Sequence, residues 1–369
     1  MNFSPNFDLA ALAIETVLPN NKVLYDDQGL PSVMVRIPKM TYKELGLGDS
    51  TDVFPAFIVN GQEVDEIYIS KYENVMYNNR AYSLPAKDPK TSINFDQAQT
   101  YCKNKGAGWH LMTRMEWALL AQWCFHNNCM PKGNNWYGKD YTESAHDHAI
   151  PASRESSGDH AGETARVLTG TGPLTWSHDG TAAGIWDLNG NVFEWVGGMR
   201  TVYGELQVLV NNNAADTAHS QSASSDQWMC ISAVDGSFIV PDGNGTTSNA
   251  IRARYKSNHW EWGIDTAADG TTEGKGCGFE GITCSSEVCD AAKLMLQALG
   301  MFKYDTTSGA YSGDYFYMNS VEAERVFLCG GSWRYSSLAG VFYAYGYYGR
   351  TTAASSIGFR SAFVKLPTA

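Results

Sequence analysis

The sequence predicts an α+β fold with short strands, two or three helices and long irregular insertions. Apolar residues make up 43% of the 369 residues and aromatic residues 12%, which is enough to build a large core. Segments typical of strands and of helices both occur in the first third of the chain. Residues 200–327 are instead rich in Asn, Ser, Thr, Gly and Asp, which is typical of loops.

Two strands and a helix are expected before residue 110. Met34 to Pro38 and Glu66 to Tyr72 carry the β-branched and aromatic residues that strands favour. The first helix is expected from Phe95 to about Lys105, because its apolar residues share one side and Gly106 follows as a stop.

Two further helices have recognisable ends. Thr113 and Glu116 have the T-x-x-E spacing of a capping box, in which each side chain accepts a hydrogen bond from a free backbone N–H. A helix is therefore expected to open at Thr113. The last helix is expected from Glu287 to Leu299, ending at Gly300. We interpret residues 200–327 as an insertion of long surface excursions built onto the core.

Charge and the N-terminal residues exclude several partners. The formal charge of −12, the pI near 5.1 and the lack of a basic cluster argue against nucleic acid or an anionic membrane surface. The first residues lack a basic region and a cleavage site, and no segment is long and apolar enough to span a bilayer. Neither a signal peptide nor membrane insertion is expected.

The cysteines and a histidine pair do not indicate a metal site. The eight cysteines include no C-x-x-C pair. Cys277, Cys284 and Cys289 are near enough in sequence to include a disulfide, but reduced, mostly buried thiols are expected without a secretion signal. His146 and His148 lack the spacing of ligands on a helix, so a solvated loop is expected there.

The stretch from Cys329 to Arg360 has an unusual composition. Between Arg334 and Ser356 there is no Lys, Glu, Gln, Met, Trp, Asp or His, although 18% of the chain is charged and it contains 12 methionines. Tyr343, Tyr345 and Tyr347 alternate with small residues, which predicts that they share one face of a strand. Tyrosines of this kind are typical of binding surfaces such as antibody paratopes. The alternative is an aromatic strand in the core.

Several motifs follow one another in an order that resembles a known family. They are MVRIPKM from Met34, EIYISKYEN from Glu66, INFDQAQTYC, HLMTRMEWALLA from His110, GIWDLNGNVFEWV from Gly184, and GGSW with IGFR near the end. Together they resemble the formylglycine-generating, sulfatase-modifying family over roughly Val33 to Val364. The resemblance implies a C-type lectin-like fold of the formylglycine-generating-enzyme type. The C-terminal block is then expected to join residues 33–200 in one domain, with Trp186, Trp195 and Trp333 filling one core.

The residues argue against the catalytic activity of that family. Its enzymes use two cysteines shortly after the GGS element, whose thiolates bind copper. The corresponding positions here are Tyr335 and Gly340, and neither residue ligates a soft metal. We therefore expect no catalytic residues, no enzyme activity and no required cofactor.

The stretch from Cys329 to Arg360 also resembles the variable region of diversity-generating retroelement proteins, which use the same lectin-like scaffold. In those systems, template adenines are randomised, mostly in AAC codons, so that Lys, Glu, Gln, Met and Trp do not arise. Every residue from Arg334 to Ser356 belongs to the permitted set. The resemblance implies that the tyrosines project to solvent rather than into the core.

The same resemblance implies which positions bind the ligand and which support them. The diversified, ligand-binding positions are expected to be Ser332, Arg334, Tyr335, Ser337, Leu338, Tyr345, Tyr347, Tyr348, Thr352, Ala354 and Ser356. Further candidates are Ser336, Tyr343, Ala344, Thr351 and Ala353. Val341, Phe342, Ile357 and Phe359 are expected in the core, Gly358 at a close backbone approach, and Arg360 paired with a carboxylate.

The resemblance further implies a structural metal ion. In the enzymes, the run equivalent to GIWDLNGNVFEW holds calcium. Carried over, the ligands would be the Asp187 and Glu194 carboxylates with the Gly190 and Val192 carbonyls, which suit Ca²⁺ or Mg²⁺. The alternative is a tight loop in which Asp187 and Asn191 bond the backbone.

The organisation and function follow from these expectations. Residues 1–31 are expected to be an attachment or oligomerisation arm, and residues 32–369 the lectin-like domain, with the insertion at about 200–327 and the variable region at about 329–360. We expect a receptor-binding protein that presents its variable surface to a cell-surface protein or glycan, as a phage tail adhesin on the virion. The alternatives are a bacterial surface or cytoplasmic sensing protein of the same type, and an enzyme of the formylglycine-generating family.

Overall fold

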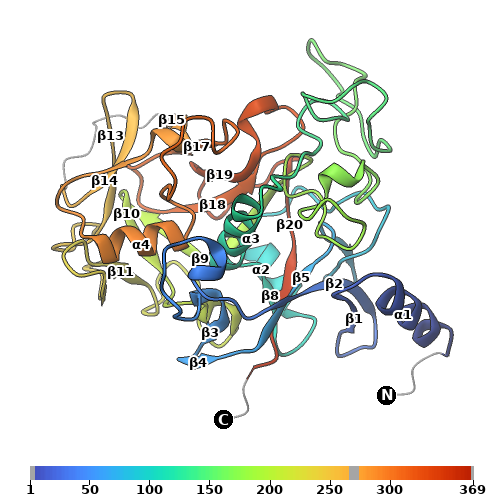
Figure 1. The fold of residues 1–369 in the computed structure, drawn as a ribbon, viewed down its shortest axis with the longest axis horizontal. Coiled ribbons are helices and arrows are strands. Elements are labelled where there is room, and N and C mark those ends of the chain that lie inside the picture. Colours follow the sequence, from blue (N-terminus) through green and yellow to red (C-terminus); the bar gives the residue numbers. More distant parts are fainter. Residues whose placement is uncertain (1–4, 266–273, 367–369) are drawn as a thin grey trace.

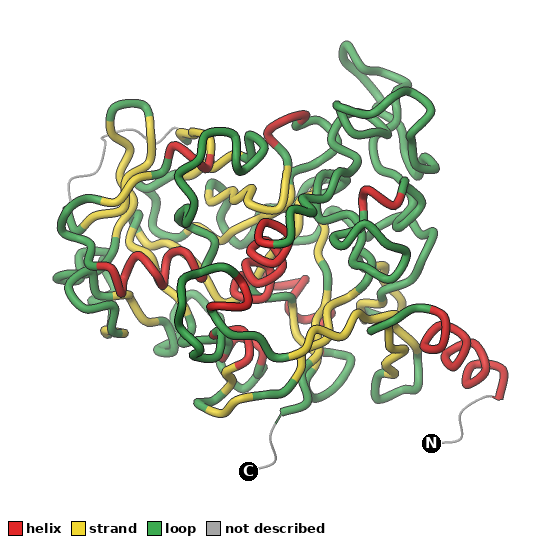
Figure 2. Tube along the Cα trace, in the orientation of Figure 1, coloured by secondary structure: helices red, strands yellow, loops and turns green. Residues whose placement is uncertain are grey.

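The first of two large sheets contains the predicted N-terminal strands (Figures 1 and 2). The computed structural model of the protein describes residues 5–265 and 274–366. Within these residues, a five-stranded sheet has the spatial order β1 (Asn21–Tyr25), β2 (Pro31–Pro38), β5 (Glu66–Ser70), β21 (Ser361–Phe363) and β8 (Trp109–Leu111). The expected strands at 34–38 and 66–72 are confirmed as β2 and β5. Strand β1 pairs with β2, so the sheet begins before residue 32. The expected domain boundary after residue 31 is therefore wrong, because residues 21–25 are part of the sheet.

The second sheet is larger and joins distant parts of the sequence. It has twelve strands among the described residues. The main path is β15 (Lys275–Gly278), β17 (Tyr315–Met318), β19 (Gly340–Gly346), β18 (Arg325–Gly330), β9 (Phe193–Val202), β10 (Glu205–Val208), β13 (Arg252–Lys256), β14 (His259–Gly263) and β16 (Thr283–Cys284). Off this path, β11 (Met229–Ile231) pairs with β10 and β12 (Phe238–Ile239), and β20 (Ile357–Phe359) pairs with β9.

Short hairpins and helices complete the described fold. The hairpins are β3 (Ile58–Val59) with β4 (Gln62–Glu63), and β6 (Val75–Tyr77) with β7 (Arg80–Tyr82). The α-helices are α1 (Pro5–Val17), α2 (Phe95–Lys103), α3 (Arg114–His126) and α4 (Asp290–Ala298). In the part of the chain that the structure describes, none of the helices has the length and apolar character to cross a bilayer.

Helix α3 begins as predicted and supports the second sheet. The Thr113 hydroxyl accepts from the Glu116 N–H at 3.1 Å, and the Glu116 carboxylate accepts from the Thr113 N–H at 2.9 Å. The predicted capping box is therefore confirmed. Further along the helix, Trp117 Nε1 donates to the backbone oxygen of Val341 at 2.7 Å. This bond ties α3 to β19, the strand that carries the predicted tyrosines.

The other expected helices are also present, with small shifts at their ends. Helix α2 opens after Asn94, which forms a capping box with Gln97. Helix α4 begins at Asp290 rather than Glu287, because Cys289 has extended backbone and accepts a hydrogen bond from the N–H of Ala292 as the N-cap.

The segment 200–327 is not a set of surface excursions, and that expectation is wrong. It supplies β10 to β17 and α4. Its Trp260, Trp262 and Phe316 are at most 1% exposed and share a core cluster with Trp117. The polar residues of this segment lie in the turns between its strands. Because these strands are short, the turns outweigh them in the composition, and the composition alone therefore indicated loops. On the left of Figure 1, the segment extends the second sheet and packs against the rest of the domain.

Trp186, Trp195 and Trp333 are all buried, but they do not fill one core as expected. Trp195 lies in the cluster between α2 and the second sheet, whereas Trp186 and Trp333 lie in two small clusters with residues of the segment 137–176. The long connection between α3 and β9 therefore builds small cores of its own, which the spacing of the tryptophans does not reveal.

Candidate binding surface

Strand β19 presents its tyrosines on one face, as the alternation predicts. The rings of Tyr343 and Tyr345 stack with centroids 6.3 Å apart, and Tyr347 follows with its ring 6.0 Å from that of Tyr345. Phe342 and Ala344 point to the opposite face and are fully buried. The face with the tyrosines is therefore distinct from the face that anchors the strand.

The tyrosines differ in exposure along this face. Tyr343 is only 1% exposed, so the expectation of solvent exposure is wrong for Tyr343 and the core alternative is correct there. Its ring is covered by those of Phe193 and Tyr335, at 5.4 and 5.6 Å. Tyr345, Tyr347 and Tyr348 are half-buried, with their other edges accessible.

A second strand from the segment 200–327 widens this face. Tyr317 of β17 lies opposite Tyr345 in a parallel register, and the two rings stack at 5.1 Å with 12° between their planes. Tyr315 lies beside Tyr343, with ring centroids 6.5 Å apart. We name the half-buried rings the tyrosine surface: Tyr315, Tyr317, Tyr335, Tyr345, Tyr347 and Tyr348.

Sequence reasoning missed Tyr315 and Tyr317 because they lie outside the compositionally unusual stretch. The alternation in Tyr315-Phe316-Tyr317-Met318 is the same period-two pattern as in β19, and that signal would have found them. Figure 1 shows β17, β19 and β18 next to one another in the upper part of the view.

The remaining positions of the predicted set are mostly accessible. Arg334 and Leu338 are exposed, and Ser337, Thr352, Ala354 and Ser356 are half-buried. Ser332 is 1% exposed, so the expectation that it faces solvent is wrong. Beside it, the backbone N–H of Trp333 donates to the backbone oxygen of Asn191 at 3.3 Å and holds the GGSW turn against the neighbouring loop.

The further candidates for variable positions also include both accessible and buried residues. Thr351 and Ala353 are exposed and Ser336 is half-buried. Ala344 is fully buried, so it does not project to solvent.

The expected support beneath the surface is confirmed. Val341, Phe342, Ile357 and Phe359 are at most 1% exposed. A Cβ on Gly358 would lie 2.8 Å from the Val192 side chain, so the close backbone approach requires glycine. Exposed side chains therefore stand on a packed, rigid framework.

The two guanidinium groups of the variable stretch are already paired. Arg334 donates from Nε and Nη2 to the two carboxylate oxygens of Glu155, both at 2.6 Å. Arg350 pairs with Glu324 at 2.7 Å and with Asp96 at 2.7 Å. The Arg334 guanidinium, through this hydrogen bond, lowers the pKa of Glu155. The surface therefore offers rings and hydroxyls rather than unpaired positive charge.

Burial affects the hydroxyl groups of Tyr335 and Tyr345 on this surface. It raises the pKa of Tyr335 and of Tyr345 above the ordinary value for tyrosine. Each of these hydroxyls therefore both donates and accepts hydrogen bonds at neutral pH.

The carboxylates of the predicted metal site are partly engaged by other groups of the protein. Both oxygens of Glu194 accept from Arg360, from Nε at 2.7 Å and from Nη2, which confirms the predicted carboxylate pair of Arg360. One Asp187 oxygen accepts from the Gly170 N–H at 2.9 Å, while Oδ1 is buried without a partner. No group of three or more His, Cys, Asp or Glu side chains in residues 5–265 and 274–366 is placed to hold a metal. A guanidinium thus supplies the positive charge that a cation would bring to Glu194.

Gly340 stands at the position that corresponds to the second cysteine of the family's enzymes, and a residue of the segment 200–327 occupies the space beside it. A Cβ built on Gly340 would lie 1.9 Å from Oδ1 of Asp314, a buried carboxyl group. The other cysteine position is Tyr335, which belongs to the tyrosine surface. All eight cysteines of the chain are free thiols in the structure, and Cys329 lies beside Arg114, whose Nη1 donates to its sulfur at 2.8 Å.

The fold and this surface define an α+β domain with a C-type lectin-like fold that carries an aromatic face on its larger sheet. The chain belongs to the family of sulfatase-modifying factor enzyme 1-like domains, whose model matches residues 50–364. The predicted fold class is thereby confirmed.

Comparison with solved structures gives distant likenesses. Treponema denticola variable protein 1 is 12% identical with a TM-score of 0.33, and the match covers 94% of this chain and 99% of that one. PvdO from Pseudomonas aeruginosa is 12% identical with a TM-score of 0.36, covering 93% and 97%. The Major Tropism Determinant P3c variant is 11% identical with a TM-score of 0.28, covering 93% and 71%. No curated protein sequence matches significantly.

Proposed function

We propose that this protein binds a ligand through the tyrosine surface and its neighbouring loops, and that a diversity-generating retroelement varies this surface. The observation that carries the proposal is the division of β19 into a buried side, with Phe342 and Ala344, and an accessible side, with Tyr345. Side chains on the accessible side can change while the packed side holds the backbone.

The composition of the surface supports binding. Tyrosine rings bring large contact areas at low entropy cost, and tyrosine is enriched among the residues that dominate interface energies. Because Arg334 and Arg350 are held by carboxylates, the surface suits a partner that presents apolar and hydrogen-bonding groups. A cell-surface protein or glycan has this chemistry.

The setting that we propose is a phage tail adhesin, attached through the N-terminal segment. Helix α1 supports this role, since Leu9, Leu12 and Val17 are 66, 62 and 72% exposed. An exposed apolar side of a helix favours contact with another protein. A structural protein of the virion would supply that contact.

A binding role is favoured over an enzyme of the family because of Gly340. The space that a cysteine side chain would need at this position holds the Asp314 carboxyl group. Tyr335 and Gly340 supply no thiolates, so they cannot bind copper as the two cysteines of the enzymes do.

The retroelement part of the proposal is tested by the DNA next to the gene. We expect a reverse transcriptase gene and a near-copy of the segment encoding residues 329–360, with adenines at codons such as those for Tyr345, Tyr347 and Tyr348. A flanking region with neither feature would overturn diversification.

The binding part is tested with purified full-length protein on a glycan array and on whole bacterial cells. The triple variant Tyr345→Ser, Tyr347→Ser and Tyr348→Ser should lose retention on whichever probe retains the wild type. Tyr203→Ser is the matched control, because Tyr203 is 42% exposed and lies outside the tyrosine surface. Equal retention of the triple variant and the wild type would overturn the assignment of the surface.

A further inference from the structure

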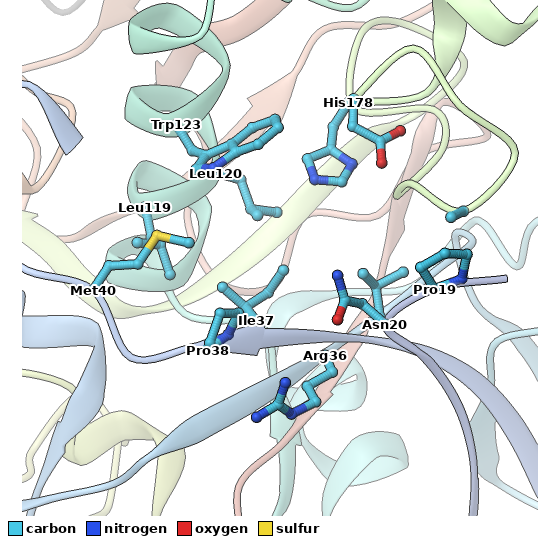
Figure 3. Close-up of a pocket in the computed structure, with 13 residues that line it drawn as sticks. Pro19, Asn20, Arg36, Ile37, Pro38, Met40, Leu119, Leu120, Trp123 and His178 are labelled. Carbon is cyan, nitrogen blue, oxygen red and sulfur yellow. The ribbon is translucent and has the colours of Figure 1, made fainter. Parts of the chain in front are cut away.

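A partly enclosed pocket lies apart from the tyrosine surface, between β2, α3 and the loop that contains His178 (Figure 3). Its volume is about 180 Å³. Ile37 and Met40 form one side, Leu119 and Leu120 of α3 form another, and Trp123 and His178 face the interior. A space of this size and apolar character accommodates a small organic ring, since cavities of about 150 Å³ bind benzene.

His178 is the polar group of this pocket, and its protonation follows from its contacts. The side chain is 6% exposed. The backbone N–H of Ile185 donates to Nδ1 at 2.8 Å, so Nδ1 carries the lone pair. Burial lowers the pKa of His178 to about 4. The ring is therefore neutral at neutral pH, and its single proton is on Nε2.

The Nε2–H group has no hydrogen-bond acceptor among the residues that the structure describes, although the ring is more than nine-tenths buried. The Nε2 atom is not among the fully buried polar atoms that lack a partner, and His178 lines the pocket, so a molecule in the pocket can reach this donor. A ligand with an acceptor would take the place of water at this group. The ring of Trp123 lies 5.0 Å from that of His178 at 42°. The two rings form an aromatic wall beside the free donor.

The charges around the pocket indicate an uncharged ligand. Arg36 is held in an ion pair with Glu66, so it offers no free positive charge. Asp179, the residue next to His178, also lines the pocket, where its negative charge disfavours anions. Its Oδ1 is already used by the Ser177 hydroxyl and by Thr181.

We propose that this pocket binds a small neutral molecule with a flat apolar ring and one hydrogen-bond acceptor, which pairs with Nε2–H of His178. This site is separate from the tyrosine surface, because it is built from β2, α3 and the 178–183 loop. The proposal does not depend on the function proposed above.

Titration calorimetry of the full chain with acetophenone and ethylbenzene tests this pairing. The two probes share a ring and similar size, and only acetophenone has a carbonyl acceptor. We expect saturable binding of both, with acetophenone about 3- to 10-fold tighter, which is the usual gain from one hydrogen bond. Equal affinities, or no saturable binding of acetophenone, would overturn the proposal.

Variants locate the binding in this pocket. His178→Phe keeps a ring but removes Nε2–H, so the preference for acetophenone should disappear. Ala183→Phe fills the pocket from its rim and should abolish binding of both probes, even if His178→Phe proves unstable. Ala182→Phe is the matched control, since Ala182 is exposed and does not line the pocket. Acetophenone binding that survives in folded Ala183→Phe protein would place the ligand elsewhere and overturn the site.

Discussion

The Asp314 carboxylate accepts a hydrogen bond from the backbone N–H of Phe342 at 2.7 Å. Asp314 belongs to the segment 200–327 and Phe342 to β19, so the bond fastens the insertion to the strand that bears the tyrosines. The same carboxyl group lies against Gly340. The buried Asp314 side chain thus holds β19 in place and also occupies the space that a cysteine side chain would need at position 340.

Replacement of Asp314 should show a distinct pH dependence. Burial raises the pKa of Asp314 well above its ordinary value of 3.8. The folded protein therefore binds this proton more tightly than the unfolded chain, and the stability from it is full below pH 3.8 and is lost as the pH rises through the folded-state pKa. Asp314→Asn keeps an oxygen acceptor but does not ionise, so its unfolding free energy relative to wild type should increase with pH.

Denaturant unfolding of both proteins between pH 4 and pH 8 checks this expectation. Asp314→Ala is the comparison: it leaves the Phe342 N–H unpaired and should cost about 1–3 kcal/mol. A constant difference between the Asn variant and wild type across the range would contradict the proposed ionisation behaviour.

Serine substitutions should separate the structural tyrosine from the exchangeable ones. Tyr343→Ser should cost about 3–5 kcal/mol, as large-to-small changes at buried aromatic positions do. Tyr347→Ser should cost about 1 kcal/mol or less, because its ring is partly in solvent. Urea denaturation midpoints at constant m-value measure both. A similar loss of unfolding free energy at the two positions would show that burial on β19 does not decide which tyrosines can be exchanged.

Trp195→Ala tests the core between α2 and the second sheet. Trp195 is fully buried, its indole N–H donates to the Ile93 backbone oxygen at 3.1 Å, and its ring meets Phe95 edge to face. The expected loss is about 3–5 kcal/mol. Trp136→Ala, at a position 38% exposed, should change thermal stability much less. An unchanged denaturation midpoint for Trp195→Ala would mean that this cluster does not contribute to the folded domain.

Chelation should leave the melting temperature unchanged, because Arg360 rather than a cation neutralises Glu194. Calorimetry with and without EDTA, together with elemental analysis, measures this. Arg360→Leu should instead cost about 3–5 kcal/mol, since it leaves a buried carboxylate unpaired. A lowered melting temperature in EDTA with bound calcium would restore the ligand set of Asp187, Gly190, Val192 and Glu194.

Features with local causes were predictable from the sequence. The start of α3 follows from Thr113 and Glu116, which meet within one helical turn. The shared face of Tyr343 and Tyr345 follows from the pleat of a strand. Partners from far away were not predictable: Tyr317, opposite Tyr345, comes from a segment whose composition is typical of loops.

The sequence by itself determined the family, the helix that supports β19, the period of the tyrosines and the buried positions of Val341 and Phe359. Only the tertiary structure decided which tyrosines remain accessible, since Phe193 and Tyr335 cover Tyr343. It also decided that Arg360 pairs with Glu194 across 166 residues. The physical reason is that backbone conformation and side-chain periodicity depend on neighbours along the chain, whereas burial and charge pairing depend on residues that folding brings together from distant segments.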